Sequence, residues 1–166
     1  MTTSMTNSAL LGPTKDASTE TMFQRTTEMT RIVTTPAELV AEYCRLHNLE
    51  PFVVSEVYDL ARDRLRQYPN CGKAGCYFFF DASGWLIYVG VSGDLGYRLG
   101  QYFHLNEERT MLVPKPNYIW RRQPRYLQTV ATRNEYEAPS LEAYLIDKLQ
   151  SLGTLENTRG IERNKC

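Results

Sequence analysis

The chain has 166 residues, of which 19 are Lys or Arg and 19 are Asp or Glu, so its formal net charge is zero. This length predicts one domain with enough residues for a buried core. The balanced charge excludes attraction of nucleic acid by an overall positive field, so such a ligand would need a local basic patch. The sequence has no apolar run of about eighteen residues or more, so we expect no membrane span.

Residues 1–34 are rich in threonine and poor in aromatic residues, which predicts a disordered tail. Thr35-Pro36-Ala37-Glu38 has the pattern of a capping box and predicts a helix to about Asn48. An apolar stripe at helical spacing predicts a second helix from about Ser55 to Tyr68. We therefore expect residues 35–73 to be a helical extension, available to a protein partner or a dimer.

Two interpretations of this helix pair are open. One is a DNA-binding helix-turn-helix, which would carry a positive face. The other is an α-hairpin packed on a sheet. The segment contains slightly more acidic than basic residues, so we favour the hairpin.

The four cysteines show no C-x-x-C spacing, and only two histidines could help to complete a zinc site. Four free thiols are the simpler expectation. Free thiols are typical of a reducing compartment, which predicts a cytoplasmic location.

An aromatic hairpin is predicted at the centre of the chain. Cys76–Phe80 and Trp85–Val91 are apolar runs, and the sequence Asp-Ala-Ser-Gly between them is typical of a turn. With these four residues as the loop, Tyr77 lies directly opposite Tyr88. Two phenols should therefore stand side by side on one face of the sheet.

A helix through about Phe103 is predicted next, with Ser92 or Asp94 as its N-cap. Arg98 and Tyr102 lie four residues apart and therefore share one face of this helix. Two glycines in its interior each cost about 1 kcal/mol relative to alanine. Such a pair indicates close approach of the helix backbone to another group, and the alternative is a strained sequence.

These residues together resemble the GIY-YIG nuclease family. The triplet Gly75-Cys76-Tyr77 stands for the first motif and Tyr88-Val89-Gly90 for the second, and Arg98 follows at the position of the family's arginine. Downstream, Glu142 resembles the glutamate of the family's helix, and Asn157 resembles its closing asparagine. Cys76 replaces an aliphatic residue and should fit a strand core, since it is small and apolar.

The resemblance covers residues 74–160 and implies an α/β (α+β) fold. The expected fold is a small, mainly antiparallel, three-stranded sheet flanked by helices, with the helical extension on its N-terminal side. Tyr126–Thr132 alternates loosely and supplies the third strand. A helix with Pro139 near its start follows and carries Glu142 beside its apolar stripe. Residues 161–166 are expected to be a polar tail.

The resemblance also implies a divalent-metal-dependent DNA endonuclease that leaves 5′-phosphate and 3′-hydroxyl ends. Glu142 would hold Mg²⁺ or Mn²⁺, since magnesium binds through one or two carboxylates and substrate phosphate. Arg98 would bind the non-bridging phosphate oxygens. The family favours Tyr77 as the base, with Tyr88 in support, and a nearby cation would lower the pKa of either phenol.

Four further positions complete the implied site. Tyr102 matches a position that holds tyrosine or histidine in the family. Gly75, Gly90 and Asn157 would support the site. The alternative is a catalytically silent DNA-binding or protein-interaction module on the same fold.

A basic segment between Arg109 and Arg125 has five basic residues, no acidic one, and interleaved aromatic residues. This composition suits a phosphate backbone with exposed bases, although a solvated loop is the simpler alternative. Beside a nuclease site the DNA interpretation is better. The candidate DNA contacts are Lys115, Arg121, Arg122 and Arg125.

Overall fold

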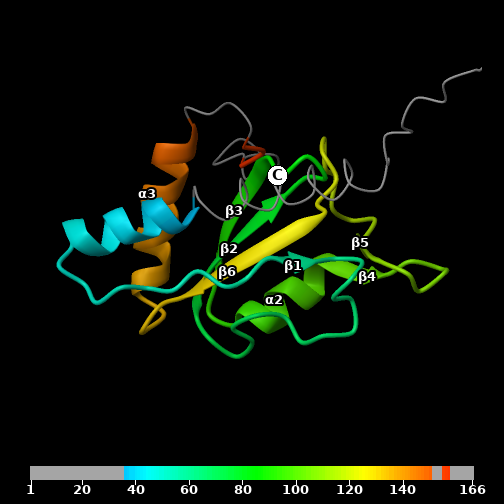
Figure 1. The fold of residues 1–166 in the computed structure, drawn as a ribbon, viewed down its shortest axis with the longest axis horizontal. Coiled ribbons are helices and arrows are strands. Elements are labelled where there is room, and N and C mark those ends of the chain that lie inside the picture. The colour runs from blue at the N-terminus through cyan, green and yellow to red at the C-terminus, as the bar shows by residue number, and fades with distance from the viewer. Residues whose placement is uncertain (1–35, 151–154, 158–166) are drawn as a thin grey trace, which may run out of the picture.

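The structure, a computed structural model, describes residues 36–150 and 155–157, and an antiparallel sheet lies at its centre (Figure 1). The strand order is β1 (Tyr58–Asp59), β6 (Tyr126–Ala131), β2 (Gly75–Phe80) and β3 (Leu86–Ser92), with every neighbouring pair antiparallel. The expected α/β class is confirmed, with β2, β3 and β6 as the three predicted strands. The predicted N-terminal tail, Thr35 and the C-terminal tail lie outside the described residues.

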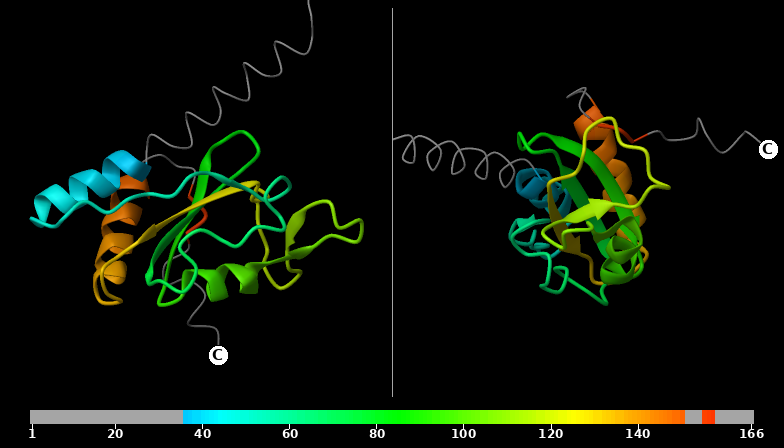
Figure 2. Two further views of the ribbon diagram at one scale, coloured as in Figure 1. Left: turned by 60° about the horizontal axis from the view of Figure 1, so that its bottom comes forward. Right: turned by 90° about the vertical axis from the view of Figure 1, so that its right-hand side faces the viewer.

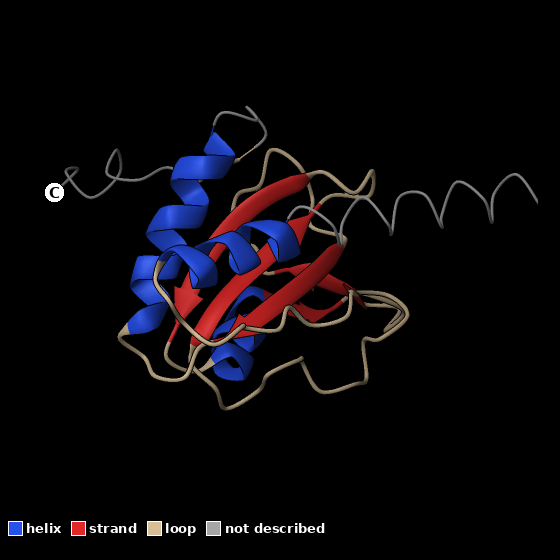
Figure 3. Cartoon of the chain, turned by 60° about the vertical axis from the view of Figure 1, so that its left-hand side comes forward, coloured by secondary structure: helices blue, strands red, loops and turns tan. Residues whose placement is uncertain are grey.

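Helices cover both faces of this sheet (Figures 2 and 3). Residues 36–46 form a first helix, which lies on one face with α3 (Glu137–Gln150). The other face is covered by α2 (Leu95–Tyr102). None of the helices in the described part of the chain is long and apolar enough to cross a membrane.

The central strand β2 is buried on both faces, which explains its continuous apolar sequence. Phe78 and Phe80 pack toward α3, while Tyr77 and Phe79 pack toward α2. Burying one such side chain contributes roughly 1.5–3 kcal/mol. Cys76 is fully buried beside Phe78, as expected for a small apolar residue in a strand core.

The hairpin has the predicted turn but a different register. The pairs are Tyr77 with Gly90 and Phe79 with Tyr88, and the register shifts between Phe79 and Phe80. The predicted pairing of Tyr77 with Tyr88 is therefore wrong. The shift is a β-bulge, which turns consecutive side chains, Ile87 and Tyr88, to the α2 face of the sheet.

The predicted helix from Ser55 to Tyr68 is also wrong. This segment instead forms the short edge strand β1 and a series of turns, and Val54 makes an isolated bridge to Val130. Both the helix-turn-helix and the α-hairpin interpretations fail with it. Within the described part of residues 35–73, only 36–46 are helical, and β1 joins the sheet.

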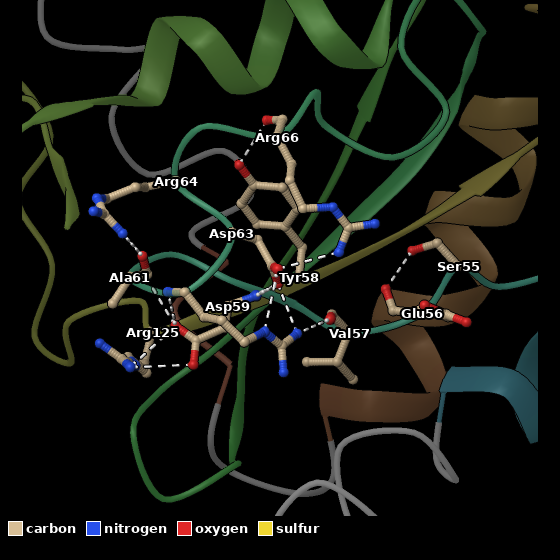
Figure 4. Close-up of polar contacts among 11 residues, drawn as sticks. Ser55, Glu56, Val57, Tyr58, Asp59, Ala61, Asp63, Arg64, Arg66 and Arg125 are labelled. Atoms are coloured by element: carbon tan, nitrogen blue, oxygen red, sulfur yellow. Dashed lines mark hydrogen bonds and ion pairs between the residues drawn. The ribbon is translucent and has the colours of Figure 1, made fainter. Parts of the chain in front are cut away.

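Two aspartates hold the chain after β1 in this conformation (Figure 4). The Asp59 carboxylate accepts hydrogen bonds from the backbone N–H groups of Ala61 and Arg62. Asp63 is only 3% exposed, and its carboxylate accepts from the Asp59 N–H and from the guanidinium groups of Arg62 and Arg66. These local bonds compete with helical ones and explain why the apolar stripe does not form a helix.

A second small sheet follows α2 and was not predicted. Its strands are β4 (Phe103–Leu105) and β5 (Leu112–Pro114), which pair antiparallel. Arg109 between them has a positive φ of 56°. The basic segment therefore starts in the turn of this hairpin and includes β5, and the rest of that segment leads to β6.

Acid should remove the stability that Asp63 contributes. Hydrogen bonds from Arg62 are the main reason that the pKa of Asp63 falls from 3.8 to about 2 in the folded chain. The stabilisation is therefore complete above about pH 4 and is lost as the pH falls toward 2. We expect Asp63→Asn to lower the free energy of unfolding at pH 7 by about 2 kcal/mol.

Urea unfolding at pH 7, 4 and 2.5 measures this effect. The matched control is Asp147→Asn, on an exposed position of α3, which should change neither the stability nor its pH dependence. If Asp63→Asn kept the acid dependence of the wild-type chain, another carboxylate would be responsible.

Candidate active site

The Tyr77 side chain crosses the neighbouring strand at Gly90. A Cβ atom at position 90 would overlap with the Tyr77 ring and its hydroxyl oxygen. Only glycine therefore leaves room for the phenol, which explains why the second triplet ends in glycine. Gly75 has a similar role elsewhere, because a Cβ there would overlap with the Val130 carbonyl of β6.

The α2 helix brings Arg98 and Tyr102 to this phenol. Asp94 is the N-cap, and its side chain accepts a hydrogen bond from the Tyr97 N–H, as one of the two predicted caps. The hydroxyl groups of Tyr77 and Tyr102 are 2.9 Å apart in a hydrogen bond. The Arg98 guanidinium lies 5.0 Å from the Tyr102 ring centroid and donates to its hydroxyl over 3.4 Å.

Of the two interior glycines of α2, only one is explained by close approach. A Cβ at Gly96 would overlap with the Cys71 thiol, whereas a Cβ at Gly100 would meet nothing within 4 Å. The expectation of close contact is confirmed for Gly96, whereas no other described residue lies close to the Cβ position of Gly100.

Tyr88 completes a cluster of three tyrosines. Its ring centroid lies 6.1 Å from that of Tyr77 and 6.3 Å from that of Tyr102. The two strand phenols therefore stand side by side as predicted, although the bulge, and not direct pairing, brings them together. Tyr77 is 1% exposed, whereas Tyr88 is half-buried and faces a groove.

Burial raises the pKa of Tyr77, and the neighbouring phenols of Tyr102 and Tyr88 raise it further. Burial is also the main cause of the raised pKa of Tyr88, to which the charge of Glu142 adds. Arg98 lowers both values by less than burial raises them. Arg98 therefore acts in the expected direction, but burial outweighs it, and both phenols carry their protons at neutral pH.

Arg98 itself stays charged. Burial lowers the pKa of its guanidinium, but the neighbouring phenols of Tyr77 and Tyr102 raise it by more. A second guanidinium nitrogen donates to the Gln101 side chain over 3.0 Å, which fixes the orientation of the fork.

Glu142 lies on α3, half-buried beside the apolar stripe, as its position in the sequence predicted. Its negative charge contributes to the raised pKa of Tyr88 and of the Cys76 thiol, after burial as the main cause for each. The carboxylate is therefore within electrostatic reach of both sheet strands of the motif.

An open groove of about 570 Å³ borders the tyrosines, and it runs from α2 to the C-terminal described residues. Asn157 closes it at β3, where its side-chain amide accepts from the Val89 N–H and donates to the Val89 carbonyl. The residues that line the groove are Tyr88, Tyr102, Asn117, Tyr118, Ile119, Trp120, Arg121, Leu155, Glu156 and Asn157.

The four basic candidates for DNA contact are not gathered in one place. Arg121 is exposed and lines the groove. Lys115 is next to α2, where its ammonium donates to the Gly100 carbonyl. Arg122 forms an ion pair with Asp81 at 3.5 Å, and Arg125 forms one with Asp59 at 3.0 Å. Asp81 and Asp59 therefore already partner these two arginines.

Three residues that the structure places at the site were not among the site residues predicted from the sequence. Tyr118 lies 4.4 Å from Tyr102 between ring centroids, and Trp120 lies 5.4 Å from Tyr88. The Glu156 carboxylate accepts from the backbone N–H groups of Arg121 and Arg122 and so holds the groove loop. The interleaving of aromatic and basic residues signalled the first two, but no local pattern signalled Glu156.

Residues 73–151 match the family model of the UvrC-like GIY-YIG domain. The chain is similar to the UvrABC system protein C of Anaplasma marginale, with 33% identity over 94 residues, 55% of this chain and 14% of that protein. The protein of the same name from Prochlorococcus marinus subsp. pastoris is 36% identical over 88 residues, 53% of this chain and 12% of that protein. The protein of the same name from Symbiobacterium thermophilum is 37% identical over 86 residues, which are 52% of this chain and 13% of that protein.

The tyrosine pair, the arginine and the matching family model define the class: residues 73–151 form a UvrC-like GIY-YIG domain. The resemblance drawn from the sequence is thereby confirmed, and it supports a nuclease function. The chain covers only 12–14% of the length of these three relatives. No solved structure is significantly similar to the chain.

Alanine at positions 90 and 100 should have opposite effects. Gly90→Ala should destabilise the fold by about 1–3 kcal/mol, because the new methyl group forces the Tyr77 phenol out of place. Gly100→Ala should stabilise it by about 0.5–1 kcal/mol, because it improves helix propensity in open space. Thermal unfolding measures both, and equal effects of the two substitutions would refute the steric role of Gly90.

Proposed function

We propose that this chain is a divalent-metal-dependent endonuclease that hydrolyses phosphodiester bonds in DNA and leaves 5′-phosphate and 3′-hydroxyl ends. The main support is the contact of Tyr77 and Arg98 with the Tyr102 hydroxyl at one end of a groove. Phosphodiester hydrolysis needs an activated water and donors for the charge that grows on phosphoryl oxygens. Phenols and a fixed guanidinium can supply both.

Arg98 is the group that we expect to bind the scissile phosphate. Its pKa is raised, so it carries its charge at any working pH. A planar guanidinium can donate two parallel hydrogen bonds to phosphate oxygens. One terminal nitrogen of the guanidinium donates to the Gln101 side chain, and the other donates to the Tyr102 hydroxyl.

Glu142 would hold the metal ion, Mg²⁺ or Mn²⁺. The fit rests on a half-buried carboxylate whose charge reaches Tyr88 and Cys76. Among the described residues, no three His, Cys, Asp or Glu side chains form a dedicated metal cage. One carboxylate suits magnesium, which keeps several waters and binds substrate phosphate. When bound, the ion would stabilise charge on the phosphate and the leaving oxygen.

The tyrosines would orient the nucleophilic water and move its proton. We assign the base to Tyr77 and a supporting role in the groove to Tyr88. Because burial raises its pKa, the Tyr77 phenol is a strong base once its proton is gone. The 2.9 Å hydrogen bond to Tyr102 is the route by which that proton would leave, as Tyr102 passes its own proton to a water molecule in the groove that it lines. Tyr102 would also fix the Arg98 side chain.

Replacing Glu142 should abolish cutting without unfolding the chain. We expect Glu142→Gln to slow the nicking of supercoiled plasmid with Mg²⁺ by about a hundredfold or more, because transition-state charge loses its counterion. Asp147→Asn, an exposed carboxylate on the same helix, should nick at the wild-type rate. Equal rates for Glu142→Gln and the wild type would favour the catalytically silent binding module instead.

Removing one hydroxyl should separate catalysis from packing. Tyr77→Phe keeps the buried ring but loses the bond to Tyr102, so we expect about 10²–10⁴-fold slower cleavage. The free energy of unfolding should change by no more than about 1 kcal/mol. Tyr136→Phe is the control, because that side chain is exposed. Unchanged cleavage by Tyr77→Phe would leave Tyr88 as the candidate base.

A further inference from the structure

The groove beside the tyrosine cluster has a wall that the proposed hydrolysis does not use. Tyr88 and Tyr102 form the side next to the catalytic groups, and Tyr118, Ile119 and Trp120 come from the segment between β5 and β6. The groove volume of about 570 Å³ falls within the range of about 300–1,000 Å³ that is typical of sites for small organic groups. Aromatic and polar residues both line this space, so it suits one flat ring system with polar edges.

The aromatic rings of this wall are held in place from behind. Tyr118 packs on Tyr102 at 4.4 Å, and Trp120 meets Phe79 and Tyr88 edge-on at 5.5 Å and 5.4 Å. The indole N–H of Trp120 is buried and has no hydrogen-bond partner among the described residues. Trp120 therefore lines the groove with its ring carbons and not with its donor. Fixed aromatic surfaces are what a stacked nucleobase requires.

Ile119 lies between these two aromatic residues and is 96% exposed. A large aliphatic side chain in that position gains nothing from folding. In proteins that bend DNA, exposed apolar side chains enter between base pairs and replace part of the lost stacking. Asn117 and Arg121 at the groove are exposed polar residues, and the segment from Arg109 to Arg125 has no acidic residue. Among the lining residues Arg121 is the basic one and Glu156 the acidic one, and the Glu156 carboxylate already accepts from two backbone N–H groups.

We propose that the groove holds one unstacked base of a DNA strand next to the phosphate to be cut. Tyr118 and Trp120 are the stacking surfaces, and Ile119 occupies the space that the displaced base leaves. The inference rests on the proposed nuclease function, because Arg98, which Tyr102 fixes, would hold the adjacent phosphate. A base that is already unpaired costs less free energy to move out of the stack, so the chain binds DNA with a single-base bulge more tightly than fully paired DNA.

Fluorescence anisotropy with the full chain tests the preference. Two labelled duplexes of equal sequence, one with a single-base bulge, are titrated in buffer with EDTA so that binding is measured without cleavage. We expect about tenfold tighter binding of the bulged duplex. Tyr118→Leu and Ile119→Ala should reduce this ratio to about twofold or less. Val53→Ala, an exposed aliphatic residue outside the groove, should leave it unchanged.

The outcomes separate this inference from the proposed function. Equal affinities for the two duplexes, or a ratio that Ile119→Ala leaves intact, would overturn the base site even if plasmid is nicked with Mg²⁺. A preference for the bulge without any cleavage would support the base site and refute the nuclease. Ile119→Ala keeps the test valid if Tyr118→Leu fails to fold, because the isoleucine side chain is almost fully exposed.

Discussion

The Tyr77 phenol lies so close to the backbone of Gly90 that no other residue fits there. This contact carries a hydroxyl of the central strand across β3, where the Tyr102 hydroxyl of α2 bonds to it. Arg98 is in turn fixed on Tyr102. Two strands and one helix are thereby joined through a buried polar pair, and burial is also what keeps the phenols protonated. One steric fact thus accounts for both the geometry and the acid–base state of the site.

Much of the central motif could be predicted from the sequence because its signals are local. Apolar runs around a turn defined β2 and β3, and the caps and the spacing of Arg98 and Tyr102 defined α2. Alternation along Tyr126–Ala131 defined the third strand. The half-buried position of Glu142 followed from its place beside an apolar stripe. Each of these inferences needs only a few neighbouring residues.

Other features depend on contacts distant in sequence and were mispredicted. The bulge at Phe79 and Phe80 changes the register without any local glycine to signal it. The segment after Val54 has helical spacing, yet pairing with β6 and the carboxylates of Asp59 and Asp63 hold it extended and turned. Arg122 and Arg125 were predicted only as DNA contacts, because Asp81 and Asp59 are remote along the chain. Local composition cannot reveal such partners.

The side chain of Asn157 has an effect beyond the groove. Strand β3 is the last strand of its sheet, and the outer edge of such a strand can pair with another molecule. The amide of Asn157 bonds to both the N–H and the carbonyl of Val89, and the backbone N–H of Glu156 bonds to the Ile87 carbonyl. Two residues therefore imitate a neighbouring strand along this rim. They protect the molecule from sheet-to-sheet aggregation at the margin nearest its tyrosine cluster.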